Sequence, residues 1–302
     1  MIRTLALTTA LLLGSTVVAQ ARDLEGALAF LPADVSTVVA IDIESTRGTN
    51  FFKDMQKELV DLSGYGREMA QLKKDTGIDV MADAKLVVYA GPDELIKKAK
   101  ESLVIVEGSF DPAKLKDFLA KKSKLPVVEK QGAGGTYYAV GDKAAFAFRG
   151  TFAVYGSTAL FDKAIAAQAA GGGKTKVQAL VNRFKGATNG FAVVGGSGQL
   201  KKFLGKSFGD VQDVKSAGIT FDFTKGVAIQ VVGIFADAGK ASAVAASLEK
   251  DLKKTAADPE YQEVGLDKVT IKSSGAEVTM SLVAEGAAGK ALSKSLKELF
   301  SE

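Results

Sequence analysis

The order of strands and helices that the sequence predicts occurs twice along the 302-residue chain, and this repetition constrains the fold more than any single motif. In the first half, Gly108-Ser109-Phe110-Asp111 ends a predicted strand and opens a helix. In the second half, Gly233-Ile234-Phe235-Ala236-Asp237 does the same, and a hairpin and a closing helix follow in both halves. We therefore predict an α+β fold of two similar repeats, each a mostly antiparallel sheet packed by helices on one face.

Hydrophobic periodicity locates the individual elements. We predict strands at 36–43, 85–90, 103–110, 126–129, 136–140, 144–149, 151–155, 191–194, 218–223, 227–235, 269–273 and 277–283. We predict helices at 51–62, 65–74, 112–122, 157–170, 176–184, 199–204, 237–255 and 287–300. In the strand 218–223, three alternate apolar residues point to one face and the polar residues between them point to the other.

Domain boundaries follow from the repeat and from one glycine run. We assign residues 1–21 to a signal peptide, 22–172 to the first repeat and 173–302 to the second. Gly171-Gly172-Gly173 is the linker between the repeats, since consecutive glycines leave the backbone unrestrained. The helix 176–184 could belong to either repeat.

The first 21 residues have the three parts of a secretory signal peptide. Arg3 supplies a positive start, 5–18 is apolar, and Ala19-Gln20-Ala21 is a small-x-small cleavage pattern. We expect cleavage after Ala21 and a mature protein that is soluble in the periplasm or outside the cell. With no cysteine, the chain has neither a lipid-anchor site nor a disulfide.

The composition excludes several kinds of chemistry. The chain contains no histidine and no cysteine, which removes Ser-His-Asp triads, thiol nucleophiles and most zinc and iron sites. We expect no cofactor and no metal. The net charge is only +4, and the 39 basic residues include six arginines, whereas specific nucleic-acid sites depend on arginine. Nucleic acid is therefore not an expected partner.

Carboxylates are the remaining candidates for catalysis. Asp42 and Asp222 lie inside predicted strands, where aspartate is depleted, and would be the pair of a carboxylate-dependent hydrolase. The simpler interpretation is that their side chains face solvent. Asp111 and Asp237 occupy equivalent places in the two repeats and are interpreted as helix N-caps.

Two groups of residues are candidates for ligand binding. Tyr137 and Tyr138 are adjacent in a strand, so they must point to opposite faces, and one should be exposed or line a cleft. Gly195, Gly196 and Ser197 follow a strand and precede a predicted helix, which is a context for anion binding as well as for a simple turn. The run of glycines before Lys174 lacks the spacing of a phosphate-binding loop.

The order of elements resembles a family of exported bacterial proteins known only as a domain of unknown function. The resemblance is carried by the signal peptide, by Phe30-Leu31-Pro32-Ala33-Asp34 before the strand Thr37 to Ile43, and by the Gly-x-Phe-Asp strand end. It implies a duplicated α+β fold and an envelope location, and it implies no activity.

We therefore expect an exported, non-catalytic protein of the bacterial cell envelope. Its expected partner is another envelope component, a protein, a lipid or a glycan, held between the two lobes. Two alternatives stay open: a carboxylate-dependent hydrolase and a structural or adhesive surface protein.

Overall fold

A computed structural model describes residues 23–53, 65–92, 101–123, 125–132, 134–196, 214–256, 262–263 and 265–292. Five predicted features therefore lie wholly or mostly outside the described residues, one of them the helix 51–62, of which only 51–53 are described. The other four are the signal peptide with Ala19 and Ala21, the helix 199–204, Ser197, and most of the closing helix 287–300.

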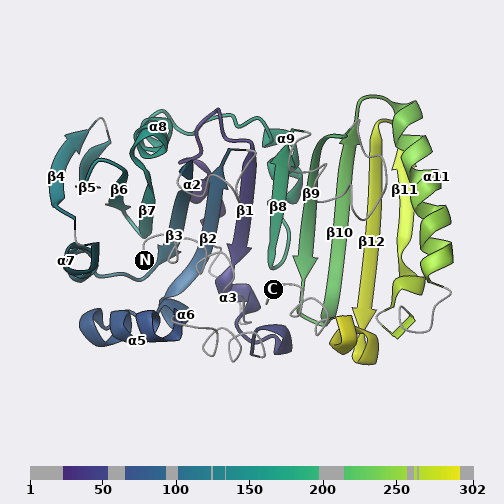
Figure 1. Cartoon of the computed structure of the whole chain (residues 1–302), viewed down its shortest axis with the longest axis horizontal. Coiled ribbons are helices and arrows are strands. Elements are labelled where there is room, and N and C mark those ends of the chain that lie inside the picture. Colours follow the sequence, from purple (N-terminus) through teal and green to yellow (C-terminus); the bar gives the residue numbers. More distant parts are fainter. Residues whose placement is uncertain are drawn as a thin grey trace.

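Twelve strands alternate with helices in the described chain (Figure 1). The strands are β1 (Thr37–Asp42), β2 (Ala84–Gly91), β3 (Leu103–Gly108), β4 (Val127–Gly132), β5 (Gly135–Val140), β6 (Ala144–Arg149), β7 (Phe152–Ser157), β8 (Gly190–Gly195), β9 (Val214–Asp222), β10 (Gly226–Phe235), β11 (Thr270–Ser274) and β12 (Glu277–Glu285). The helices are α2 (Leu24–Leu28), α3 (Ile43–Thr46), α5 (Tyr65–Thr76), α6 (Val80–Asp83), α7 (Pro112–Ser123), α8 (Thr158–Ala169), α9 (Gln178–Phe184), α11 (Ala238–Thr255) and the 3₁₀ turn η2 (Leu266–Lys268).

All twelve strands form one sheet, in the order β11-β12-β10-β9-β8-β1-β2-β3-β7-β6-β5-β4. Every neighbouring pair is antiparallel. Read outward from the β1–β8 border, one side runs β1-β2-β3-β7-β6-β5-β4 and the other runs β8-β9-β10-β12-β11. In each half the third strand leads into a helix, α7 or α11, before the chain returns to the sheet. The predicted α+β repeat is confirmed, and the structure adds that both halves share a single sheet.

The border between the halves is a regular five-residue ladder. Thr37 of β1 pairs with Val194 of β8, and Ile41 pairs with Gly190. Figure 1 shows β1 and β8 side by side in the middle of the sheet, far from either end. The two repeats therefore continue one hydrogen-bonded surface instead of packing as separate lobes.

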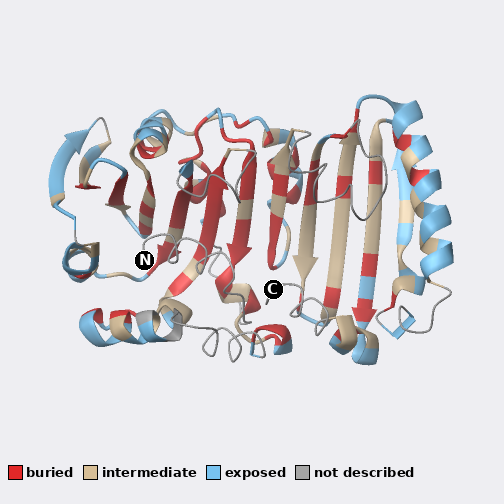
Figure 2. Cartoon of the chain, viewed as in Figure 1, coloured by how far each residue is buried: buried red, intermediate tan, exposed pale blue. Residues whose placement is uncertain are grey.

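Apolar side chains pack on both faces of the middle strands. On the face we call the α8 face, Val38 and Ala40 pack in one core with residues of α2, α8 and α9. On the opposite face, the α11 face, Ile41 packs with Phe51 and with Phe223, whose rings stack at 4.1 Å between centroids. Figure 2 shows the middle strands largely buried, whereas the outermost strand β4 is exposed. Burial on both faces explains why β1, Thr-Val-Val-Ala-Ile-Asp, reads as a nearly continuous apolar run.

The predicted helix N-caps are confirmed. Asp111 Oδ1 accepts a hydrogen bond from the backbone N–H of Ala113 at 3.0 Å, and Asp237 Oδ1 accepts one from Lys240 at 2.9 Å. Each aspartate thereby satisfies a backbone donor that the first helical turn leaves free.

The glycine run between the repeats lies against the body of the protein. Gly172 donates its N–H to Ala167 O at 2.8 Å. A Cβ on Gly173 would lie 2.4 Å from Leu31 O, so a side chain at that position would force the backbone apart. The glycines therefore permit a close backbone approach as well as a change of direction.

Within the described residues, no helix is both long and apolar enough to cross a membrane.

Candidate functional site

Tyr137 and Tyr138 point to opposite faces of β5, as predicted. The ring of Tyr137 lies 5.5 Å from that of Phe161 of α8, on the α8 face. The ring of Tyr138 stacks on Phe146 at 5.0 Å, and Lys116 Nζ lies 5.3 Å from its centroid. Both tyrosines are half-buried.

Gly195 and Gly196 lie at the end of β8 and are held by backbone hydrogen bonds. Gly195 N–H donates to Ser36 O at 2.7 Å and Gly196 N–H donates to Lys215 O at 2.9 Å. Both amides are therefore engaged within the sheet and do not point at an open anion site. Six strand spacings separate β8 from β5, about 29 Å at roughly 4.8 Å each. The structure does not bring these glycines together with the tyrosines.

Asp42 and Asp222 lie on either side of β8, at the same end of the sheet. Their strands are two spacings apart, about 10 Å. Asp42 is buried, so the interpretation that it faces solvent is wrong: its Oδ1 accepts a hydrogen bond from Ser45 N at 2.8 Å and begins α3. Asp222 Oδ1 accepts from the N–H and Oγ1 of Thr224 at 2.8 and 2.6 Å.

The environment of Asp222 lowers the pKa of its carboxyl. Partial burial acts to raise the pKa, but the hydrogen bonds from Thr224 and Thr188, together with the charge of Lys225, outweigh it. A carboxylate held in the ionised form by local donors suits a turn and does not suit a general acid.

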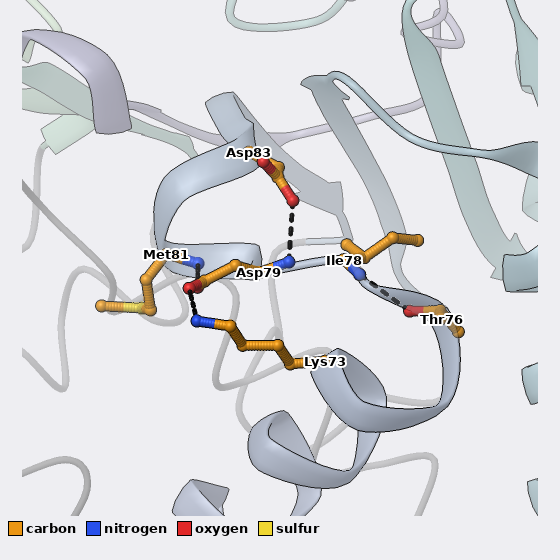
Figure 3. A network of polar contacts seen from close by, with 6 residues as sticks. All are labelled: Lys73, Thr76, Ile78, Asp79, Met81 and Asp83. Atoms are coloured by element: carbon orange, nitrogen blue, oxygen red, sulfur yellow. Dashed lines mark hydrogen bonds and ion pairs between the residues drawn. The ribbon is translucent and has the colours of Figure 1, made fainter.

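A second polar network joins the end of α5 to α6 (Figure 3). Lys73 Nζ lies 2.6 Å from Asp79 Oδ2, and Asp79 Oδ1 accepts from Met81 N at 3.1 Å. Asp83 Oδ2 in turn accepts from Asp79 N at 2.7 Å. Each carboxylate is used to begin or close the short helix α6, so the network is a structural junction. Within the described part of the chain, no group of three or more acidic residues is arranged to hold a metal ion.

Glu107 is a buried carboxyl on the α8 face of β3. Its Oε2 accepts a hydrogen bond from Asp23 N at 3.0 Å, at the start of α2. Burial raises the pKa of Glu107 above its usual value, although the Asp23 N–H partly offsets this effect. Glu107 therefore joins the start of α2 to the sheet.

Arg149 is the least satisfied charged group among the described residues. It lies at the end of β6, directly opposite Phe152 of β7. Its Nη1 donates to two backbone carbonyls, Thr136 O at 2.9 Å and Phe148 O at 2.8 Å. Its Nε and Nη2 are buried and have no hydrogen-bond partner. Burial also lowers the pKa of this guanidinium from its usual value.

The strands next to Arg149 separate at this point. Pairing between β5 and β6 runs only from Val140↔Ala144 to Tyr138↔Phe146, whereas β6 and β7 pair over their full length. Arg149 therefore takes the Thr136 carbonyl that a longer β5–β6 ladder would have bound. The side chain fills the opening between the strands, and Tyr137 follows directly after Thr136 along β5.

Sequence reasoning named Tyr137 and missed Arg149. The available signals were the scarcity of arginine, six in the whole chain, and the placement of Arg149 at the end of an otherwise apolar strand, Ala-Ala-Phe-Ala-Phe-Arg. What could not be read from the sequence was that β5 leaves β6 at this point and that two of the three guanidinium nitrogens are left without acceptors.

The fold and the site together define a class: an α+β protein built on one long antiparallel sheet with two similar halves, carrying a half-buried arginine whose Nε and Nη2 atoms are buried without hydrogen-bond partners. Solved structures of TP0453 share the architecture. Crystal form III of TP0453 has a TM-score of 0.54 and 8% identity, covering 88% of this chain and 97% of that chain. Crystal form I has a TM-score of 0.52 and 10% identity, covering 89% and 96%. At these identities the likeness is one of fold.

No protein-family model matches the chain, and no curated protein matches it. The resemblance to an exported family of unknown function therefore stays a prediction, and the likeness to TP0453 extends along nearly the whole described fold.

Proposed function

We propose that this chain is an exported, non-catalytic binding protein of the bacterial cell envelope. It binds another envelope component, and the opening between β5 and β6 is its binding site. The observation that carries the proposal is one edge of the half-buried Arg149, where Nε and Nη2 are buried and have no hydrogen-bond partner, beside the half-buried Tyr137. Buried donors without acceptors are costly, roughly 1–3 kcal/mol each, and rare in folded proteins.

The location differs from the one expected from the sequence. A ligand between two lobes would lie near β1 and β8, but there the sheet is continuous and the glycines are engaged in backbone hydrogen bonds. The β5–β6 opening lies in the first half, near the outer edge of the sheet.

The non-catalytic part of the proposal is supported by the use of the carboxylates. Asp42 begins α3 and Asp222 closes a turn, so the pair that a hydrolase would need is already engaged with its own backbone. Export is supported by the composition of residues 1–21 and by the cleavage pattern Ala19-Gln20-Ala21. N-terminal sequencing of the protein from the cell exterior or periplasm should begin at Arg22. A sequence beginning at Met1 would contradict export.

The binding proposal is tested by native mass spectrometry of the full protein, purified gently from the envelope fraction of its own cells. We expect an added mass on the wild-type protein. We also expect it on the control variant Arg183→Lys, because the wild-type Arg183 forms an exposed ion pair with Glu277, away from the proposed site. The added mass should be lost from Arg149→Lys. An added mass that survives Arg149→Lys would overturn the location of the site, and a bare wild-type protein would overturn the binding function.

A further inference from the structure

The two unpartnered nitrogens of Arg149, Nε and Nη2, form a pair of donors that can bind two oxygens of one ligand group. Nε–H and the adjacent Nη2–H lie in one plane and point in parallel, which is the side-on fork that grips two oxygens of the same group. The other edge of the guanidinium is occupied, because Nη1 already donates to the Thr136 and Phe148 carbonyls. Two donors at fixed spacing and a full positive charge select a carboxylate or a phosphate over a neutral acceptor.

The fork has no acidic partner in the protein. Within the part of the chain that the structure describes, no carboxylate oxygen lies within ion-pair distance of Arg149. A charge removed from water without a counter-ion is unfavourable, and the lowered pKa of Arg149 is consistent with that environment. The exposed pairs Lys163–Asp34 and Lys185–Glu25 show that acidic residues accompany cations elsewhere on the same face.

A glycine borders Nη2. Gly135 lies across from Arg149, and a Cβ built on it would be 3.8 Å from Nη2, so the missing side chain borders the fork. Gly135 has a φ of +95°, which an L side chain rarely adopts, and this conformation keeps the position a glycine.

Access of an anion to Nε and Nη2 depends on movement of the hairpin formed by β4 and β5. Both nitrogens are buried, so an anion reaches them only when β5 moves away from β6. That movement separates only three β5–β6 residue pairs, whereas β4 and β5 stay paired over six positions. It also parts the Tyr137–Phe161 and Tyr138–Phe146 ring contacts and the hydrogen bond from Arg149 to Thr136 O. β4 is the last strand of the sheet, so the hairpin is held from one side. Local opening of an edge element with few contacts costs far less than global unfolding.

We propose that Arg149 is the anion-recognising residue of this opening, and that the ligand presents a carboxylate or a phosphate group side-on to Nε and Nη2. This inference rests on the proposed function, and it adds the chemical class of the ligand. The alternative is that Arg149 only clamps two carbonyls and binds nothing else.

The test is a titration followed by NMR on the full mature protein labelled with ¹⁵N-arginine. The mature chain contains five arginines, so the Nε–H spectrum is simple. Two Nε–H signals should exchange slowly with water, those of Arg149 and Arg47, because both Nε atoms are buried. The Arg149 signal is the one that is absent from Arg149→Lys. The exposed Arg67 is the internal control. The probes are inorganic phosphate in one arm and acetate in the other, at constant ionic strength.

We expect a saturable shift of the Arg149 Nε–H signal, with half-saturation in the millimolar range, while the Arg67 signal moves little and linearly. Saturation with acetate alone assigns a carboxylate ligand, and saturation with phosphate alone assigns a phosphate. An Arg149 signal that behaves like that of Arg67 in both arms would overturn the proposal. The titration itself uses wild-type protein. If Arg149→Lys does not fold, Arg47→Lys identifies the other slowly exchanging Nε–H signal, and the one that remains belongs to Arg149.

The two proposals fail in different ways. If an envelope ligand is found by mass spectrometry but neither anion moves the Arg149 signal, the binding function stands and the anionic class is wrong. If the signal saturates but the purified protein carries no added mass, the anion site stands and the envelope ligand is wrong.

Discussion

The side-chain amide of Asn189 donates from Nδ2 to Oγ of Ser45 at 3.0 Å, joining two positions 144 residues apart. Asn189 is fully buried, and its Oδ1 accepts a hydrogen bond from Phe223 N at 2.5 Å. Its own backbone carbonyl accepts from Asp42 N at 2.9 Å. One residue thus connects β1, β8 and β9 at the border where the two halves of the sheet meet.

Replacing Asn189 by alanine should destabilise the protein by about 2–4 kcal/mol, because the buried Phe223 N–H loses its acceptor and Ser45 Oγ, which still donates to Thr188 O, loses the Asn189 donor. Urea unfolding followed by circular dichroism measures the change. The matched control is Asn182→Ala, at an exposed position in α9 where the amide only accepts from Gln178 Nε2 at 3.0 Å. If Asn182→Ala lowers the free energy of unfolding as much as Asn189→Ala does, the border network has no special role.

Gly190→Ala should disrupt the β1–β8 ladder. A Cβ on Gly190 would lie 2.4 Å from Ala40 O and 2.7 Å from the Phe221 ring, and Gly190 has a φ of +157°. Overpacking of this kind costs about 1–3 kcal/mol, and the backbone conformation adds to it. Thermal unfolding provides the comparison, with Gly186→Ala as the control because nothing lies within 4 Å of its Cβ position. Equal melting temperatures for the two variants would contradict the tight approach at the border.

Glu107→Gln should change how stability depends on pH. Burial raises the pKa of Glu107 in the folded protein, so the folded state holds its proton more tightly than the unfolded state does. The contribution of Glu107 to stability is therefore complete below its unfolded pKa, about 4.3, and is lost as the pH rises through the folded value. Glutamine keeps an oxygen that can accept from Asp23 N–H without the charge.

The free energy of unfolding, measured from pH 4 to pH 8, should thus decline for the wild type relative to Glu107→Gln. The variant should be at least as stable as the wild type at neutral pH. Glu129→Gln, on the exposed edge strand β4, reports the effect of removing one surface carboxylate. Parallel curves for the wild type and Glu107→Gln would refute the raised pKa.

Asp79→Asn should weaken the junction of α5 and α6 only slightly. The side chains of the ion pair between Asp79 and Lys73, drawn in Figure 3, are partly to largely exposed, and such pairs contribute little to stability. The Lys73 hydrogen bond lowers the pKa of Asp79, so its contribution is present above the unfolded pKa and is lost as the pH falls through the folded value. A double-mutant cycle with Lys73→Ala, at low and high salt, isolates the pair. Coupling that does not decrease with salt would argue against an exposed ion pair.

Local patterns predicted many elements well. The interpretation of Asp111 and Asp237 as N-caps required only their positions before apolar helical stripes, and both caps are present. The same reasoning failed at Asp42. It read 36–43 as one strand, whereas Asp42 ends β1 and begins α3, because its carboxylate caps the next helix and the strand stops there.

The ligand candidates were harder to judge, since a site depends on which strands become neighbours. Tyr137 and Gly195 were both reasonable choices from their local sequence. The strand order places them about 29 Å apart, and no local pattern encodes that order. Arg149 was overlooked because an arginine at a strand end is ordinary until the acceptors around it are known.

The sequence by itself determined the α+β class, the repeated order of elements and the faces of the individual strands. These follow from side-chain alternation, helical periodicity and capping, which act over a few residues. Only the tertiary structure decided that β1 pairs with β8 to join both repeats in one sheet, and that β5 leaves β6 beside Arg149. Both results depend on contacts between residues far apart in the chain, where packing of the whole sheet selects the partners.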